Sequence, residues 1–161
     1  MSEVASNLVA LADAVVARIN AMPAEYFPTA VSAERILSRV VDVADLKAGD
    51  PPLVLVYPAV TKQSRAGGGR SPVFISKPGV VLRVMGRVGV GAAADAACEQ
   101  DMLLLELLAE CCKGVCLSVA GIKDSQAVLE EVEGDPAFYD EYLTNDHCFV
   151  ADLKLTFAGV A

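Results

Sequence analysis

The sequence is most regular at Phe149-Val150-Ala151-Asp152-Leu153-Lys154-Leu155-Thr156-Phe157. Every second side chain from position 149 to position 157 is apolar, and polar side chains occupy most of the alternate positions. Successive side chains of a strand point to opposite faces of a sheet. This period of two therefore predicts a strand with one face in the core.

Other stretches predict further strands for the same sheet. Leu53-Val54-Leu55-Val56-Tyr57 is apolar on both faces, which is typical of a central strand, and we expect Pro58 to weaken pairing at its end. Residues 80–90 alternate between more and less apolar positions, which predicts a half-buried strand. A short extended piece is expected around residues 30–37 and a short strand around residues 128–132.

Two longer segments predict helices that cover this sheet. Residues 3–22 repeat apolar side chains at steps of three and four, and residues 92–113 are rich in Ala, Leu and Glu. Shorter helical turns are expected at residues 42–46 and at residues 136–143. The second turn would have Asp135 as its N-cap and a proline at its first helical position.

The order of these elements predicts the fold class. Strands that follow one another without an intervening helix indicate a largely antiparallel sheet. We therefore expect an α+β fold, with this sheet packed against the two main helices and a long loop between two of its strands. A chain of 161 residues can bury most of its apolar surface as one domain, and its sequence contains no internal repeat. We therefore expect residues 1–161 to form a single domain.

The long loop is expected at residues 61–79, which contain three consecutive glycines and two prolines. It carries the basic residues Lys62, Arg65, Arg70 and Lys77. Compact domains rarely keep such a connection unless it is used. These four basic residues are therefore candidate contacts with another subunit or with a partner protein.

The chain as a whole is acidic, with a formal net charge of −8 from 21 acidic and 13 basic residues. Glu130, Glu131, Glu133 and Asp135 belong to a stretch that contains no basic residue before Lys154. A protein that binds nucleic acid by neutralising phosphates needs the opposite balance, so specific binding of DNA or RNA is disfavoured. A solvated acidic face is the ordinary explanation of this stretch.

Composition argues against disorder and against a membrane-spanning segment. Hydrophobic residues make up 54% of the chain and charged residues 21%. Charge or proline interrupts each apolar stretch before the ~18 residues needed to cross a bilayer. The acidic start at Glu3 lacks the basic region of a secretory signal, so we expect a cytoplasmic protein. Its five cysteines are expected to be reduced, buried thiols.

The strongest enzymatic signal is Gly89-Val90-Gly91-Ala92-Ala93-Ala94, which matches the dinucleotide fingerprint G-x-G-x-x-A between an expected strand and an expected helix. Glycines there let the backbone approach a pyrophosphate at the helix N-terminus. However, Asp95, Glu99 and Asp101 would repel phosphate, and no clear parallel strand supplies the ribose-binding acid about 20 residues further on. A glycine turn between a strand and a helix is the simpler explanation.

Three other patterns lack the features of catalytic or metal sites. Gly67-Gly68-Gly69-Arg70-Ser71 lacks the Gly-Lys-Ser/Thr ending of a phosphate-binding loop. His147 adjoins Cys148, and neighbouring side chains of a strand point apart, so this histidine could not deprotonate that thiol. Cys111 and Cys112 would project about 100° apart on a helix, and they lack the C-x2-C spacing of structural zinc. We therefore expect no catalytic residue, no metal and no cofactor.

Several short motifs follow one another along nearly the whole chain. They are L-A-D-A-V-V-A-R-I-N at residues 11–20, A-E-R at 33–35, the turn at 42–46, L-V-L-V-Y-P at 53–58, Q-S-R at 63–65, F-Y-D-E-Y-L at 138–143, Phe149 and L-K-L-T-F at 153–157. In this order and spacing they resemble the tail-terminator or tail-completion family of long-tailed bacteriophages and prophages. The glycine-rich loop and the acidic stretch differ from the family pattern, so a neighbouring neck role such as head closure stays open.

The resemblance implies a structural virion protein of the phage neck, not an enzyme. It implies a ring, commonly a hexamer, that terminates the tail tube and joins the tail to the head connector while DNA passes through without specific binding. The implied partners are other copies of the chain, the tail tube protein and the head connector or adaptor proteins, with the sheath protein as a further candidate. The implied location is the virion, after assembly in the bacterial cytoplasm.

Two further hypotheses stay open. One is a small nucleotide- or dinucleotide-binding enzyme that uses the turn at residues 89–94. The other is a host adaptor protein unrelated to phages. Saturable thermal stabilisation by one member of a nucleotide panel would favour the enzyme.

Overall fold

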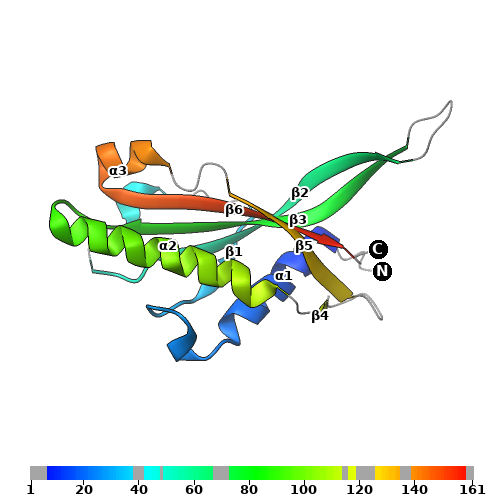
Figure 1. Cartoon of the computed structure of the whole chain (residues 1–161), viewed down its shortest axis with the longest axis horizontal. Coiled ribbons are helices and arrows are strands. Elements are labelled where there is room, and N and C mark those ends of the chain that lie inside the picture. Colours follow the sequence, from blue (N-terminus) through cyan, green and yellow to red (C-terminus); the bar gives the residue numbers. More distant parts are fainter. Residues whose placement is uncertain are drawn as a thin grey trace.

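A computed structural model gives the fold and describes residues 7–37, 42–47, 49–66, 73–113, 116–118, 126–134 and 139–158. Its elements, in chain order, are α1 (Asn7–Asn20), the 3-10 helix η1 (Ala24–Tyr26), β1 (Ala33–Arg35), the 3-10 helix η2 (Val43–Asp45), β2 (Leu53–Ala66), β3 (Val73–Arg87), α2 (Ala92–Cys112), β4 (Cys116–Ser118), β5 (Gln126–Glu133), α3 (Asp140–Asp146) and β6 (Cys148–Ala158). Figure 1 shows the long strands running through the middle of the molecule, with α2 lying along them.

The strands form one sheet in the order β1-β2-β3-β6-β5-β4. β1 is parallel to β2, and the other strand pairs among the described residues are antiparallel. One of the two central strands of this sheet, β6, is the strand that the period-two pattern at residues 149–157 predicts. The expected α+β class, with a largely antiparallel sheet and two main helices, is therefore confirmed.

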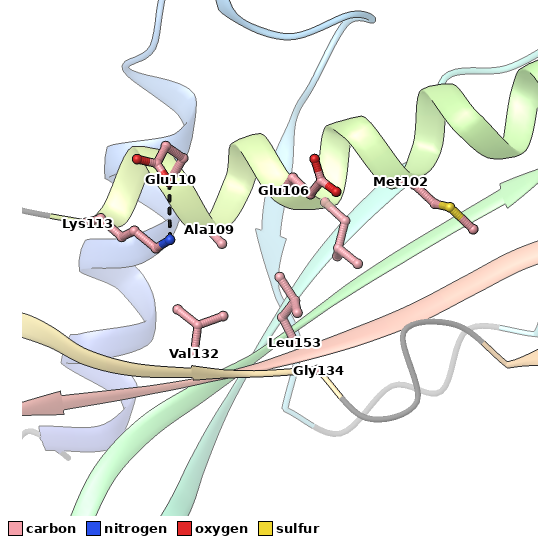
Figure 2. Close-up of a pocket in the computed structure, with 9 residues that line it drawn as sticks. Met102, Glu106, Ala109, Glu110, Lys113, Val132, Gly134 and Leu153 are labelled. Atoms are coloured by element: carbon pink, nitrogen blue, oxygen red, sulfur yellow. Dashed lines mark ion pairs between the residues drawn. The ribbon is translucent and has the colours of Figure 1, made fainter.

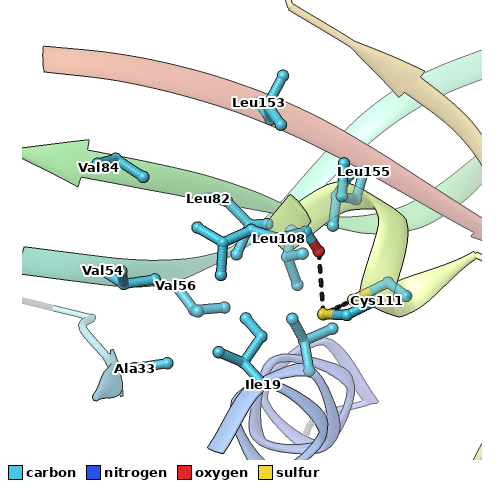
Figure 3. Close-up of a cluster of buried hydrophobic side chains, with 14 of the residues drawn as sticks. Ile19, Ala33, Val54, Val56, Leu82, Val84, Leu108, Cys111, Leu153 and Leu155 are labelled. Carbon is cyan, nitrogen blue, oxygen red and sulfur yellow. Dashed lines mark hydrogen bonds between the residues drawn. The ribbon is translucent and has the colours of Figure 1, made fainter. Parts of the chain in front are cut away.

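The main core lies between one face of the sheet and the helices α1 and α2. Alternate residues of the strands point into it, including Val56 of β2 and Leu82 of β3, and both are fully buried. Figure 3 shows these side chains around Ile19 of α1 and Leu108 of α2. The described part of the apolar stripe of residues 3–22 thus lies in the core, as its spacing predicts, and Leu104, Leu105 and Leu108 of α2 are buried with it.

A smaller core covers the opposite face of the sheet. Leu55 lies between two residues that face α1 and α2, so its side chain must point the other way. It is buried there with Ile36, Met85 and Val150, and residues of η2 and α3 pack against this cluster. β2 is therefore apolar on both faces in its first half, as a central strand should be.

Two side chains fix α1 against its neighbours. Asn20 donates from its amide nitrogen to the Ala33 carbonyl at 3.1 Å and accepts from the Ala33 N–H at 2.8 Å, which holds β1 beside the end of α1. The Arg18 Nε–H donates to the Cys111 carbonyl at 2.9 Å and ties α1 to the last turn of α2. These bonds also satisfy backbone groups that the helix end and the short strand leave open.

The stretch expected as a long loop, residues 61–79, is mostly a β-hairpin. β2 continues to Ala66 and β3 begins at Val73, and the two strands stay paired up to these residues. Pairing also passes through Pro58, where it was expected to weaken. The loop prediction was wrong because ladder hydrogen bonds join backbone groups, so a ladder anchored in the core continues through polar sequence. Residues 67–72, which join the strands, lie outside the described part.

The limits of α3 differ from those expected. α3 spans Asp140–Asp146, whereas the sequence predicts a helical turn at residues 136–143. Tyr139 is the N-cap and makes no capping bond with its side chain, and Asp135 lies outside the described residues. The turn at residues 42–46 is confirmed as η2.

Candidate functional site

The outer parts of β2 and β3, residues 60–66 and 73–78, form a two-stranded ribbon that is called the arm below. Figure 1 shows the ribbon continuing past the rest of the sheet. Three of the four basic candidates lie on it: Lys62 opposite Lys77, and Arg65 opposite Phe74. Arg70 lies outside the described residues. The sequence therefore identified basic positions that share one projecting element, although it misjudged the structure of that element.

Charge is strongly separated between this hairpin and the remainder of the chain. Residues 51–94, which contain β2 and β3, include six basic residues and no acidic one. The other residues include 7 basic and 21 acidic ones. Uneven charge of this kind creates fields that orient and steer a partner during association.

A groove lies between α2 and β5 and is called the α2–β5 groove below. It has a volume of about 480 Å³ and is lined by Met102, Leu105, Glu106, Ala109 and Glu110 of α2, by Lys113 just after that helix, by Val132 and Gly134, and by Leu153 of β6. Figure 2 shows Val132 and Leu153 facing the helix across this space. A methyl group on Gly134 would come within 2.7 Å of Leu153 Cδ2, so the glycine keeps this end of the groove open.

Three of the four acidic candidates lie on β5, next to the groove. Glu130, Glu131 and Glu133 are exposed. Val132 lines the groove, so Glu131 and Glu133 point to the opposite face of the sheet. Asp135 lies outside the described residues. β6 separates β5 from β3 in the sheet, so the basic and the acidic candidates belong to different strands that are not neighbours.

A polar cluster pins α3 to the second face of the sheet. Arg83 of β3 and Asp152 of β6 form a bidentate ion pair, with bonds of 2.7 and 2.9 Å, and the guanidinium lies 5.7 Å from the ring centre of Tyr57. The Tyr139 hydroxyl donates to Asp152 Oδ2 at 2.9 Å. The hydrogen bond to Asp152 raises the pKa of Arg83, and the bond to the same carboxylate raises the pKa of Tyr139. The charged and polar groups of this cluster already bond to one another, so the cluster is better suited to stabilising the fold than to binding a ligand.

Asp101 of α2 is a buried carboxyl group that sequence reasoning missed. Its side chain is 7% exposed, and burial raises its pKa to about 6. It lies in a cleft of about 360 Å³ that is also lined by Asp50, Gly86 and Arg87. A signal was available, because Asp101 precedes Leu104, Leu105 and Leu108 at helical spacing and so falls on the buried stripe.

The glycine turn at residues 89–94 joins β3 to α2. Gly89 and Gly91 adopt positive φ angles of 80° and 84°, which explains why glycine is needed at both positions. The neighbours of β3 in the sheet are β2 and β6, and both are antiparallel to it. A dinucleotide-binding turn normally follows a strand of a parallel sheet. The turn therefore lies between a strand and a helix, as expected, but that strand is antiparallel to both of its neighbours.

His147 and Cys148 are neighbours in the chain but lie in different environments. His147 is exposed and adopts a left-handed conformation before β6, whereas Cys148 is buried and its thiol donates to the Asp146 carbonyl at 3.2 Å. The sulfurs of Cys111 and Cys112 lie 4.0 Å apart in the core, closer than their expected divergence on a helix suggested. In the part of the chain that the structure describes, no three His, Cys, Asp or Glu residues gather in a way that could hold a metal ion.

Comparison with models of known protein families gave no match, and a search of curated proteins gave none either. None of the described helices is long and apolar enough to cross a membrane. The arm and the α2–β5 groove are the two candidate surfaces that the described residues offer.

Proposed function

We propose that the chain is a structural protein of the phage neck, where copies of it form a ring that terminates the tail tube and joins the tail to the head connector. The order and spacing of the motifs that resemble the tail-terminator family support this proposal. The observation that carries it is the separation of charge between the acid-free strands β2 and β3 and the acidic remainder of the chain.

Separated charge favours assembly in which different surfaces of identical subunits meet. A ring needs such a heterologous interface, together with a rotation that closes. Copies with a net charge of −8 repel one another on average, and a basic arm that contacts an acidic neighbour offsets this repulsion. A copy number of six follows from the family resemblance alone.

The acidic face of β5 is proposed to face the DNA channel or its rim. Replacing Glu130, Glu131 and Glu133 with lysine should leave the fold intact, because these side chains are exposed. It should also make DNA retention depend on salt, since each new cation can bind a phosphate. An unchanged salt response in assembled particles would exclude a position in the channel.

The composition of tailed particles tests the function itself. Particles from cells that carry this gene should contain several copies of the protein at the neck, measurable by quantitative mass spectrometry and by imaging with a specific label. The expected neighbours are the tail tube protein and the head connector or adaptor proteins, with the sheath protein as a further candidate. A single copy, or absence from the particles, would exclude the ring.

The enzymatic alternative has a separate test. A thermal-shift panel of nucleotides and dinucleotides should leave the melting temperature unchanged if the turn at residues 89–94 is only a turn. A saturable shift of several degrees would favour the enzyme.

A further inference from the structure

Among the residues that the structure describes, the α2–β5 groove is a largely apolar surface that no element covers. Leu105 and Ala109 line it from α2, and Val132 and Leu153 line it from β5 and β6. An apolar hollow of this size, held open between a helix and a strand, is typical of a surface that binds a partner. The chemistry around the groove indicates what that partner must carry.

The helix beside the groove, α2, carries acidic residues along its length. Residues 92–112, which form α2, contain five acidic residues and no basic one. Two of them, Glu106 and Glu110, line the groove, and both are exposed. Lys113 pairs with Glu110 at 3.2 Å at the end of the helix. An occupant that suits this groove therefore combines apolar residues with positive charge.

The arm has this chemistry. Its residues, 60–66 and 73–78, include Lys62, Arg65 and Lys77, the apolar run Val73-Phe74-Ile75 and no acidic residue. β3 pairs with β6 only as far as Gly79, so among the described strands the arm is held by its own two-stranded ladder. A two-stranded hairpin is marginally stable in water, and it gains stability by packing against another surface.

The arm and the groove of one copy belong to separated parts of its sheet. The arm continues β2 and β3, whereas the groove lies at β5, beyond β6. The ladder shifts register between Val60 and Lys62 and then stays paired to Ala66, so the arm remains an extended ribbon and meets a groove most readily on another molecule.

We propose that the arm of one copy docks in the α2–β5 groove of a neighbouring copy and places its basic residues beside Glu106 and Glu110. This inference rests on the proposed ring and identifies the two surfaces that meet in it. The contact is heterologous, because the arm of each copy engages one neighbour while its groove receives the arm of the other.

Charge reversal in full-length protein tests the docking. E106K/E110K and K62E/R65E should each weaken self-association at low salt by roughly tenfold or more, because like charges then face each other across the contact. Combining all four substitutions in one chain should restore association, and mixing the two double variants should produce complexes between them. Light scattering and native mass spectrometry measure these outcomes.

A matched control is available on the same helix. D95K/E99K changes the same charge at the same spacing of four residues, at exposed positions outside the groove. It should leave association within about twofold of the unchanged protein, since it raises net charge without touching the contact. Equal loss in the two helix variants would show a general charge effect and would overturn docking in this groove.

Zero-length coupling of lysine to carboxylate gives a second, direct readout. A mixture of isotopically light and heavy protein should yield links from Lys62 or Lys77 to Glu106 or Glu110, with the two labels combined in one linked peptide pair. Links from these lysines only to other acids, links only within one chain, or no association at any concentration would each overturn the inference. If particles nevertheless hold the protein as a ring, the function stands and only the docking site is wrong.

Discussion

The inner and outer parts of β2 and β3 share one hydrogen-bonded ladder but differ in almost everything else. In the inner part, β1 and β6 flank the pair, and Val54, Leu55 and Val56 are buried on both faces of the sheet. In the arm, pairing to β1 and β6 has ended within the described residues, and the sequence becomes basic and polar. The ladder therefore sets the direction of the arm, whereas side-chain packing in the inner part contributes most of the stability.

The largest effect is expected in the inner part, at Leu82. Its side chain is fully buried between the helices and the sheet, so Leu82→Ala should lower the free energy of unfolding by about 2–5 kcal/mol. Urea denaturation at constant pH measures this change. Leu103→Ala is the control, because this leucine is 45% exposed on α2 and should cost under about 1 kcal/mol. Similar losses in the two variants would contradict a stability concentrated in the core.

A second effect should appear at Asp101, beside the inner end of β3. Its folded pKa of about 6 lies above the unfolded value of 3.8, so the folded chain binds more protons between these two pH values. Stability from this group is therefore lost as pH rises through the window and stays low above it. Burying the ionised carboxylate costs at most about 3 kcal/mol at neutral pH, at 1.36 kcal/mol per pKa unit.

Asp101→Asn removes this dependence. The variant should gain stability relative to the unchanged protein as pH rises from about 4 to 7, and the gain should level off above pH 7. Urea denaturation of both proteins across this range measures the difference. Asp95→Asn is the control on the same helix, because Asp95 is exposed. The difference in stability between this variant and the unchanged protein should not grow with pH in the same way. A gain that falls as pH rises would refute the burial effect.

The inner part of β2 and the strand β6 of the same sheet are also what the sequence predicts best. Period two at residues 149–157 and apolarity on both faces at residues 53–57 follow directly from where side chains of a strand point. The ladder of the arm gave no such signal, because a ribbon outside the core needs no apolar alternation. Hence the glycines and prolines of residues 61–79 predicted a loop, and only the positions of the charges were informative.

The groove could not be predicted because it depends on contacts between distant residues. Ala109 and Val132 meet only after α2 has packed across the sheet beside β6. No local pattern encodes that approach, and Gly134 reads in the sequence as an ordinary turn residue. Asp101 is different, because its place on the leucine stripe was visible and its burial could have been inferred.

A smaller effect is expected at Tyr139, which connects α3 to the second face of the sheet. Tyr139→Phe removes the hydroxyl that donates to Asp152 Oδ2 at 2.9 Å, and should cost about 0.5–1.5 kcal/mol. Thermal and urea unfolding measure it. Tyr142→Phe is the matched control, since the Tyr142 ring packs edge-on against Tyr139 at 6.1 Å and the ring is kept. Equal costs would mean that the hydroxyl bond contributes nothing of its own.

The smallest effect on stability is expected from removing most of the arm. Residues 63–76 are replaced by Asn-Gly, so that Lys62 and Lys77, already paired in the ladder, flank a two-residue hairpin turn. A two-stranded ribbon is only marginally stable by itself, so its favourable contacts and the conformational entropy lost on ordering it nearly cancel. Removing it should therefore change the free energy of unfolding by under about 1 kcal/mol.

The same variant separates stability from assembly. Self-association at low salt should be lost although the monomer unfolds at nearly the same urea concentration, because the arm contributes its surface to a neighbour and not to its own core. A loss of more than about 2 kcal/mol would place the arm inside the folding unit. Normal association by a shortened but stable chain would instead show that the basic ribbon is not the contact, and the charge it carries would then need another explanation.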